Sequence, residues 1–160
     1  MDGSGRERAA DDGSPSAVHM DDFATVRLVQ LAEIIARGAS EVFEARFGVR
    51  NTELRILVQL SGREALAVNE LARRTRVDKA WISRSITALE RRGLVRRDRH
   101  PTDTRASLVS LTAEGRGLIA ELAPVAQARN ERLLDGLDRA EVHRLLNALL
   151  ARADELLRNP

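Results

Sequence analysis

Apolar residues recur at spacings of three and four along most of the chain, a pattern typical of helices that bury one face. Polar residues suited to capping a helix stand where several of these segments begin: Asn51 or Thr52, Asp78, Thr112 and Asp138. Together the two signals predict helices over residues 23–47, 52–61, 68–75, 78–93, 112–137 and 138–157.

Two short runs, residues 94–97 and 107–111, instead suit β-strands, and the loop between them contains Pro101 and Asp103. They should pair as a hairpin. A short helix, a turn, a basic helix and a hairpin follow one another over residues 68–115, and this order predicts a winged helix-turn-helix. The expected fold class is therefore mainly α with a small β-hairpin wing (α+β).

The apolar pattern also predicts how the chain is divided. Residues 1–22 lack apolar periodicity, so we expect a disordered leader. Residues 51–112 form the predicted winged domain, between an N-terminal helix over 23–50 and C-terminal helices over 113–158. These flanking helices hold more apolar residues than a single surface layer needs, so we expect them to pack against a second copy of the chain. The alternative is a bundle formed within one chain.

The second helix of a helix-turn-helix enters the DNA major groove. In the predicted helix 78–93, Ile82, Ile86 and Leu89 recur at i, i+4 and i+7 and must face the core. The outward face near the start of this helix then carries side chains able to contact bases or phosphates. These predicted DNA-binding residues are Lys79, Ala80, Ser83, Arg84 and Thr87.

The one tryptophan, Trp81, directly precedes this apolar stripe. We favour packing of Trp81 against a neighbouring helix over a base contact. At the hairpin tip, Arg105 and then Arg99 are the arginines predicted to reach an adjacent minor groove, whose negative potential attracts arginine. Asp103 would be repelled by DNA, so we expect it to orient Arg105 or Arg84.

Charge is concentrated in the same region. The chain as a whole carries a net charge of +2, but residues 71–105 hold eleven basic against four acidic residues, which leaves −5 for the remainder. Such a local excess favours a polyanionic partner, and we expect double-stranded DNA.

The sequence lacks the motifs that would indicate several other classes of function. There is no cysteine, which excludes a disulfide framework and a thiol switch and is compatible with the cytoplasm. The three histidines are far apart in the sequence, so we expect no metal site. We found no catalytic nucleophile motif, no glycine loop for phosphates and no apolar run long enough for a membrane. The sequence therefore predicts a non-enzyme without a cofactor.

The sequence resembles the multiple antibiotic resistance regulator (MarR) family in two stretches, NELARRTRVDKAWISRSITALERRGLV and DTRASLVSLTAEG. The second matches the family's Asp-x-Arg wing and its Leu-Thr-x-x-Gly passage into the next helix. The resemblance implies a cytoplasmic homodimer, with each winged domain binding half of a palindromic operator, and a small-molecule effector. No residue of the chain identifies the effector site.

Two hypotheses remain at this point. The first is a homodimeric repressor that a small-molecule effector, aromatic or anionic, releases from its operator. The second is a non-sensing winged-helix module with an architectural or protein-interaction role. A wing that binds protein should favour exposed apolar residues, whereas this wing favours arginine, so the first hypothesis is preferred.

Overall fold

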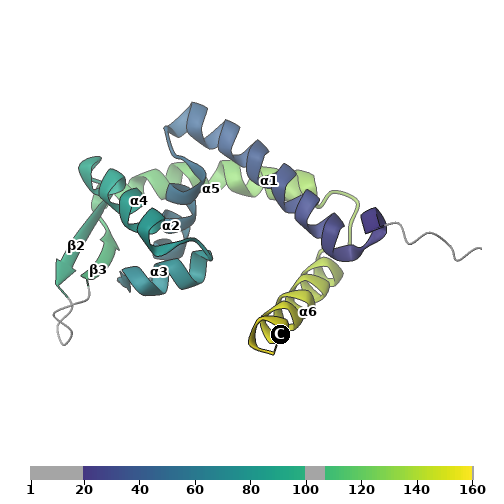
Figure 1. Cartoon of the computed structure of the whole chain (residues 1–160). Helices are drawn as coiled ribbons and strands as arrows, with labels where there is room; N and C mark the ends of the chain where they lie inside the picture. The colour runs from purple at the N-terminus through teal and green to yellow at the C-terminus, as the bar shows by residue number, and fades with distance from the viewer. Residues whose placement is uncertain (1–19, 100–106, 160) are drawn as a thin grey trace, which may run out of the picture. The chain divides into compact units, whose positions relative to one another are not determined.

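The computed structural model describes residues 20–99 and 107–159, and its elements follow the predicted order (Figure 1). After a 3-10 turn, Met20–Asp22, they are α1 Ala24–Phe47, α2 Asn51–Ser61, β1 Leu66–Ala67, α3 Val68–Thr75, α4 Lys79–Arg91, β2 Val95–Arg99, β3 Ser107–Leu111, α5 Ala113–Leu133 and α6 Arg139–Arg158. The predicted fold class, mainly helical with a small sheet, is confirmed. The chain divides into two units between Ala39 and Ser40, inside α1.

The described part of the chain begins at Met20, near the end of the predicted leader. Residues 1–19 lie outside the described part of the chain, but Met20–Asp22 form an ordered turn before α1. Arg27 holds this turn, because its guanidinium donates to the backbone oxygen of Asp21 at 3.2 Å and to the Asp22 carboxylate at 3.1 Å.

Three of the predicted helix caps are present. Asp78 accepts backbone N–H groups of Ala80 and Trp81 at the start of α4, and Asp138 caps α6 in the same way. Thr112 accepts the Gly115 N–H at the start of α5. These side chains satisfy donors that the first turn of a helix leaves without partners.

The predicted cap of the second helix was wrong. Asn51 already lies inside α2, and the N-cap position belongs to Arg50. Glu53 reaches back from the first turn and accepts the Arg50 backbone N–H at 3.0 Å. A carboxylate at this position satisfies the free donor, so the helix does not need Asn51 or Thr52 as a cap.

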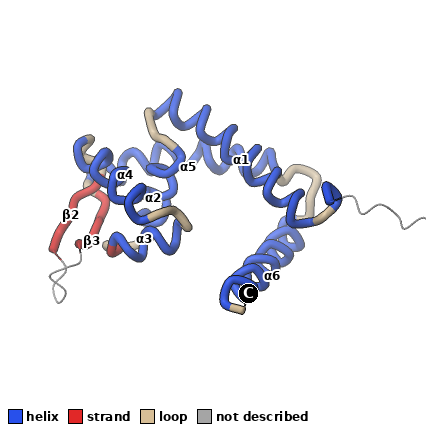
Figure 2. Tube along the Cα trace, in the orientation of Figure 1, coloured by secondary structure: helices blue, strands red, loops and turns tan. Residues whose placement is uncertain are grey.

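The sheet has three antiparallel strands in the order β1-β3-β2. Figure 2 shows β2 and β3 running side by side. The predicted hairpin of β2 and β3 is confirmed, in a register that pairs Val95 with Leu111 and Arg99 with Ser107. The strand β1 was not predicted, because two residues are too few to show alternation. It pairs Leu66 with Val109 on the free edge of β3.

One hydrophobic core fixes α4 against the rest of the winged domain. Ile82, Ile86 and Leu89 are all fully buried, as predicted. They belong to a cluster with side chains from α2, α3, the sheet and the residues just before α2 and β2: Val49, Ile56, Leu57, Leu60, Leu71, Leu94, Val95, Val109 and Leu111. The opposite face of α4 therefore points away from the core.

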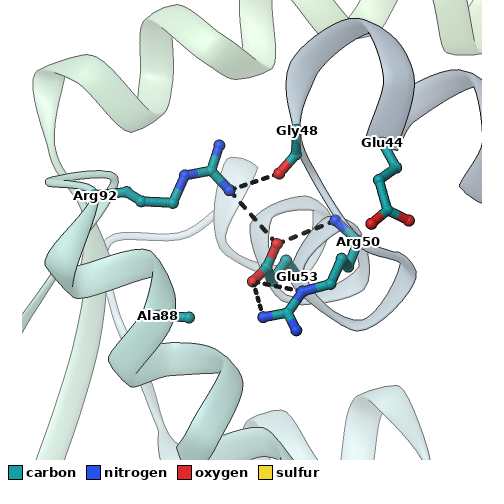
Figure 3. A pocket seen from close by; sticks show the side chains of 6 residues that line it. All are labelled: Glu44, Gly48, Arg50, Glu53, Ala88 and Arg92. Carbon is teal, nitrogen blue, oxygen red and sulfur yellow. Dashed lines mark hydrogen bonds and ion pairs between the residues drawn. The ribbon is translucent and has the colours of Figure 1, made fainter.

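A charged cluster joins the C-terminal end of α4 to the segment between α1 and α2 (Figure 3). Its centre is the Glu53 carboxylate, which is 2% exposed. The Arg50 guanidinium donates to it at 2.7 Å, and Arg92 lies 3.5 Å away. Arg92 also donates to the Gly48 backbone oxygen at 2.8 Å. The hydrogen bond with Glu53 raises the pKa of Arg50 above its ordinary value.

The start of α5 passes very close to the start of β2. A Cβ atom placed on Gly115 would lie 2.0 Å from the backbone oxygen of Leu94, whereas one on Gly117 would meet no atom within 4 Å. Thr112 joins the same two segments through its hydroxyl, which donates to the Gly93 oxygen at 2.6 Å. Only glycine fits this crossing without a backbone shift.

Gly115→Ala should lower the free energy of unfolding by about 3 kcal/mol, the upper end for overpacking, because the added methyl group collides with backbone. Gly117→Ala is the matched control and should raise it by about 0.5–1 kcal/mol, as expected for an unobstructed helix position. Urea titrations at one fixed protein concentration measure both. Equal stabilities of the two variants would contradict the close approach.

Glu53→Ala should lower the free energy of unfolding by about 1–3 kcal/mol, because it removes a buried carboxylate that accepts several charged or backbone donors. The half-exposed arginines around it can regain water, which limits the loss. The control is Glu70→Ala, which removes a less buried carboxylate, 27% exposed, paired with Arg73 and Arg74. Similar losses in the two variants would show that the buried cluster contributes no more than a surface ion pair.

Candidate nucleic-acid interface

The outward face of α4 brings together the five helix residues predicted to bind DNA. Lys79, Ala80 and Arg84 are exposed, and Ser83 and Thr87 are partly buried. A shallow hollow on this face is lined by Ser83, Arg84, Thr87, Ala88 and Arg91. The burial of the opposite stripe, rather than any bond among these five residues, sets this arrangement.

The hydroxyl of Thr87 already has partners inside the chain. It donates to the Ser83 backbone oxygen at 3.0 Å and accepts from the Arg97 guanidinium at 3.1 Å. Arg97 also lies 3.7 Å from the Glu90 carboxylate. The wing strand β2 is thereby tied to the outward side of α4.

Sequence reasoning missed this role of Arg97. A signal was available, because alternate residues of a strand share one face. Val95 is buried beneath α4, so the residue two positions later points to the same side. The predicted role of Thr87 at the interface stays open, with one lone pair of its hydroxyl still available.

Trp81 contacts a neighbouring helix, as predicted. Its indole Nε1 donates to the hydroxyl of Thr52 in α2 at 3.0 Å. The side chain is nevertheless 48% exposed, and the Arg84 guanidinium lies over the ring with its Cζ 4.8 Å from the centroid. The two residues thus form a cation–π contact on the outward face of α4.

The wing residues are only partly described. Arg99 ends β2 and is exposed. Arg105 and Asp103 belong to residues 100–106, outside the described part of the chain, and their predicted roles stay predictions.

The structure describes ten of the eleven basic residues of segment 71–105, all but Arg105, and divides these ten into two groups. Six have a carboxylate within ion-pair distance: Arg73, Arg74, Arg76, Arg92, Arg96 and Arg97. Four others, Lys79, Arg84, Arg91 and Arg99, have no such partner among residues 20–99 and 107–159. Three of these four lie on α4 and the fourth ends β2, so the uncompensated charge follows the predicted DNA-binding elements.

The same described ranges offer no support for two alternatives. No three His, Cys, Asp or Glu side chains gather there as a metal site would require. None of the helices described has the length and apolar character needed to cross a membrane.

Comparison with known proteins identifies the family. The model of the MarR family matches residues 49–107, from the start of the winged domain to the beginning of β3. An HTH-type transcriptional regulator of Bacillus subtilis, YdgJ, is 32% identical over 117 residues, which are 73% of this chain and 71% of that protein.

Solved structures have the same fold. A MarR/EmrR family regulator from Acinetobacter sp. ADP1 superposes with a TM-score of 0.78 at 26% identity, over 88% of this chain and 99% of the other. BpsR of Bordetella bronchiseptica, whose DNA binding is regulated by 6-hydroxynicotinic acid, reaches 0.72 at 24% identity, over 85% and 96%. The relatives and the geometry of α4 agree: the chain belongs to the MarR family and is a DNA-binding transcriptional regulator.

Proposed function

We propose that this regulator is a homodimeric repressor that occupies a palindromic operator and is released from it by a small-molecule effector. The observation that carries the DNA-reading part is the outward face of α4. Lys79, Arg84 and Arg91 lie there without a carboxylate partner in the described ranges. Arginine donates in a planar fork that fits guanine O6 and N7, which makes Arg84 the proposed base-reading residue.

Two copies of α4 suit a palindromic site. In a symmetric dimer, recognition helices enter successive major grooves about 10 base pairs apart. Arg99 and Arg105 would then reach the flanking minor grooves from the wing. A dimer seated in this way blocks a promoter by occupying it, which is the proposed means of repression in the cytoplasm.

The apolar face of α6 supports the dimer. Leu145, Leu149 and Leu156 share a helical face with Leu146, Leu150 and Leu157, and their exposed fractions run from 40% to 76%. None of the residues of α6, 139–158, is buried within the chain. An exposed apolar stripe of this kind favours burial against a second copy over a bundle formed by one chain.

The effector is proposed by analogy. BpsR, which shares the fold, responds to 6-hydroxynicotinic acid, an aromatic carboxylic acid. A ligand of this class would act here by favouring a dimer whose helix spacing mismatches the operator. The arginines around Glu53 are already engaged with that carboxylate, so they are poor candidates for holding a ligand anion. We assign no residue to the effector site.

Genome-wide footprinting of the bound protein should recover palindromic sites, and titration of such a site with variants tests the interface. Arg84→Ala should reduce the preference for the operator over unrelated DNA by about 1–3 kcal/mol, the range for one bidentate base contact. Arg105→Ala should weaken binding to both DNAs. Removal of one side chain that neutralises a phosphate should reduce the slope of log affinity against log salt by about 0.9.

Arg144→Ala is the matched control, since it removes an exposed arginine of α6 that pairs with Glu141. This variant should change neither the preference for the operator over unrelated DNA nor the slope of log affinity against log salt. If the titration curves of Arg84→Ala and Arg105→Ala both matched those of the wild-type protein, the assigned contacts would be refuted. A wild-type protein without preferred sites would favour the architectural alternative, as would operator binding that no aromatic acid weakens.

Leu146→Asp combined with Leu149→Asp should convert the dimer to a monomer, because two charges would have to be buried in an apolar interface. Sedimentation equilibrium measures the mass directly. Val58→Asp is the control, since Val58 is an exposed apolar residue of α2, 52% exposed. A double variant that still sediments as a dimer would exclude this face of α6 as the interface.

A further inference from the structure

Trp81 and Arg84 form a contact that the proposed function does not require by itself. They lie one helical turn apart on α4, and the guanidinium covers the indole at 4.8 Å from Cζ to the ring centroid. This distance is within the range of a cation–π interaction. The ring is the only tryptophan of the chain and stands at the start of the helix that reads DNA.

Trp81 is held at two points. The ring is held by its Nε1, which donates to the Thr52 hydroxyl of α2 at 3.0 Å, and the backbone that carries it is held at the helix start, where the Trp81 backbone N–H donates to the Asp78 carboxylate at 3.1 Å. The next residue, Ile82, is fully buried in the core. The half-exposed ring is therefore a fixed surface beside the outward face of α4.

The fixed ring limits the conformations that the Arg84 side chain can adopt. An exposed arginine samples many rotamers, and ordering them opposes binding. Contact with the ring restricts the guanidinium, and no hydrogen bond to another residue of the described ranges occupies its N–H donors. The arginine is then ordered before it meets a base, with its donors available.

We propose that Trp81 is a positioning residue that sets the DNA preference of this regulator by holding Arg84 in a base-reading orientation. The proposal rests on the proposed function, because it presumes that Arg84 reads a base. Trp81 itself makes no base contact in this arrangement. Thr52 is part of the device, since its hydroxyl holds the edge of the ring.

The contact can be tested without DNA. The chain has one tryptophan and no tyrosine, so its fluorescence reports Trp81 alone. Arg84→Ala should uncover the ring and increase quenching by acrylamide, which is neutral and so insensitive to the changed charge. Arg91→Ala is the matched control, because it removes an arginine from the same helix at a distance from the ring. Equal quenching of wild type and Arg84→Ala would overturn the contact.

The positioning role is tested by a double-mutant cycle on operator and unrelated DNA. Trp81→Ala should lower the preference for the operator by about two- to fivefold, the equivalent of an exposed cation–π contact. In the Arg84→Ala background the same change should cause no further loss. Binding to unrelated DNA and its salt slope should stay at wild-type values, which a disrupted fold would not allow.

Trp81→Phe keeps an aromatic face and should restore part of the preference, and Val58→Ala controls for loss of an exposed apolar side chain. An equal loss from Trp81→Ala with and without Arg84 would overturn the proposal, because Trp81 would then act on DNA by itself. If the proposed function itself were wrong, the result would be distinct, because the wild-type protein would then bind no DNA sequence in preference to another. Acrylamide quenching would still decide whether the contact exists.

Discussion

Burial of one side of α4 is the constraint on which the interface depends. Ile82, Ile86 and Leu89 have no exposed surface, and each fully buried aliphatic side chain contributes about 1.5–3 kcal/mol. A surface ion pair contributes about 0–1 kcal/mol, so no pair of exposed charges approaches the combined contribution of these three side chains. Rotating α4 would bring Arg84 inward and expose the stripe. The apolar face therefore determines which polar residues can meet DNA.

Arginine performs two separate tasks in this chain. Arg92 and Arg97 use their donors inside the molecule: Arg92 bonds to Gly48 in the segment before α2, and Arg97 ties β2 to Thr87 of α4. Arg84 makes only a face contact with Trp81 among the contacts described for it, which leaves its donor edge available. A count of basic residues cannot separate these tasks, because the difference lies in where the partners fold.

The sequence allowed α3, α4, the wing and most helix caps to be predicted, because periodicity and capping act between residues a few positions apart. What it missed depends on contacts between distant segments. The contact of Trp81 with a neighbouring helix was predicted, but its partner Thr52, 29 positions away, was not, and neither was the bond of Arg92 to Gly48, which spans 44 positions. The strand β1 exists only through its pairing with β3. Arg97 was partly predictable, since strand alternation indicates the face of β2 on which its side chain lies but does not identify Thr87 as its partner.

The distribution of charge also bears on how the protein meets DNA. A chain of net charge +2 is attracted to a polyanion only weakly as a whole, but residues 71–105 are strongly positive and the remainder is negative. An excess of positive charge in one segment turns that segment toward the phosphates during approach. Weak overall attraction keeps non-specific binding low, because that binding depends on the number of phosphates neutralised. Under the proposed function, preference for a site then comes from ordered contacts at α4 and the wing rather than from total charge.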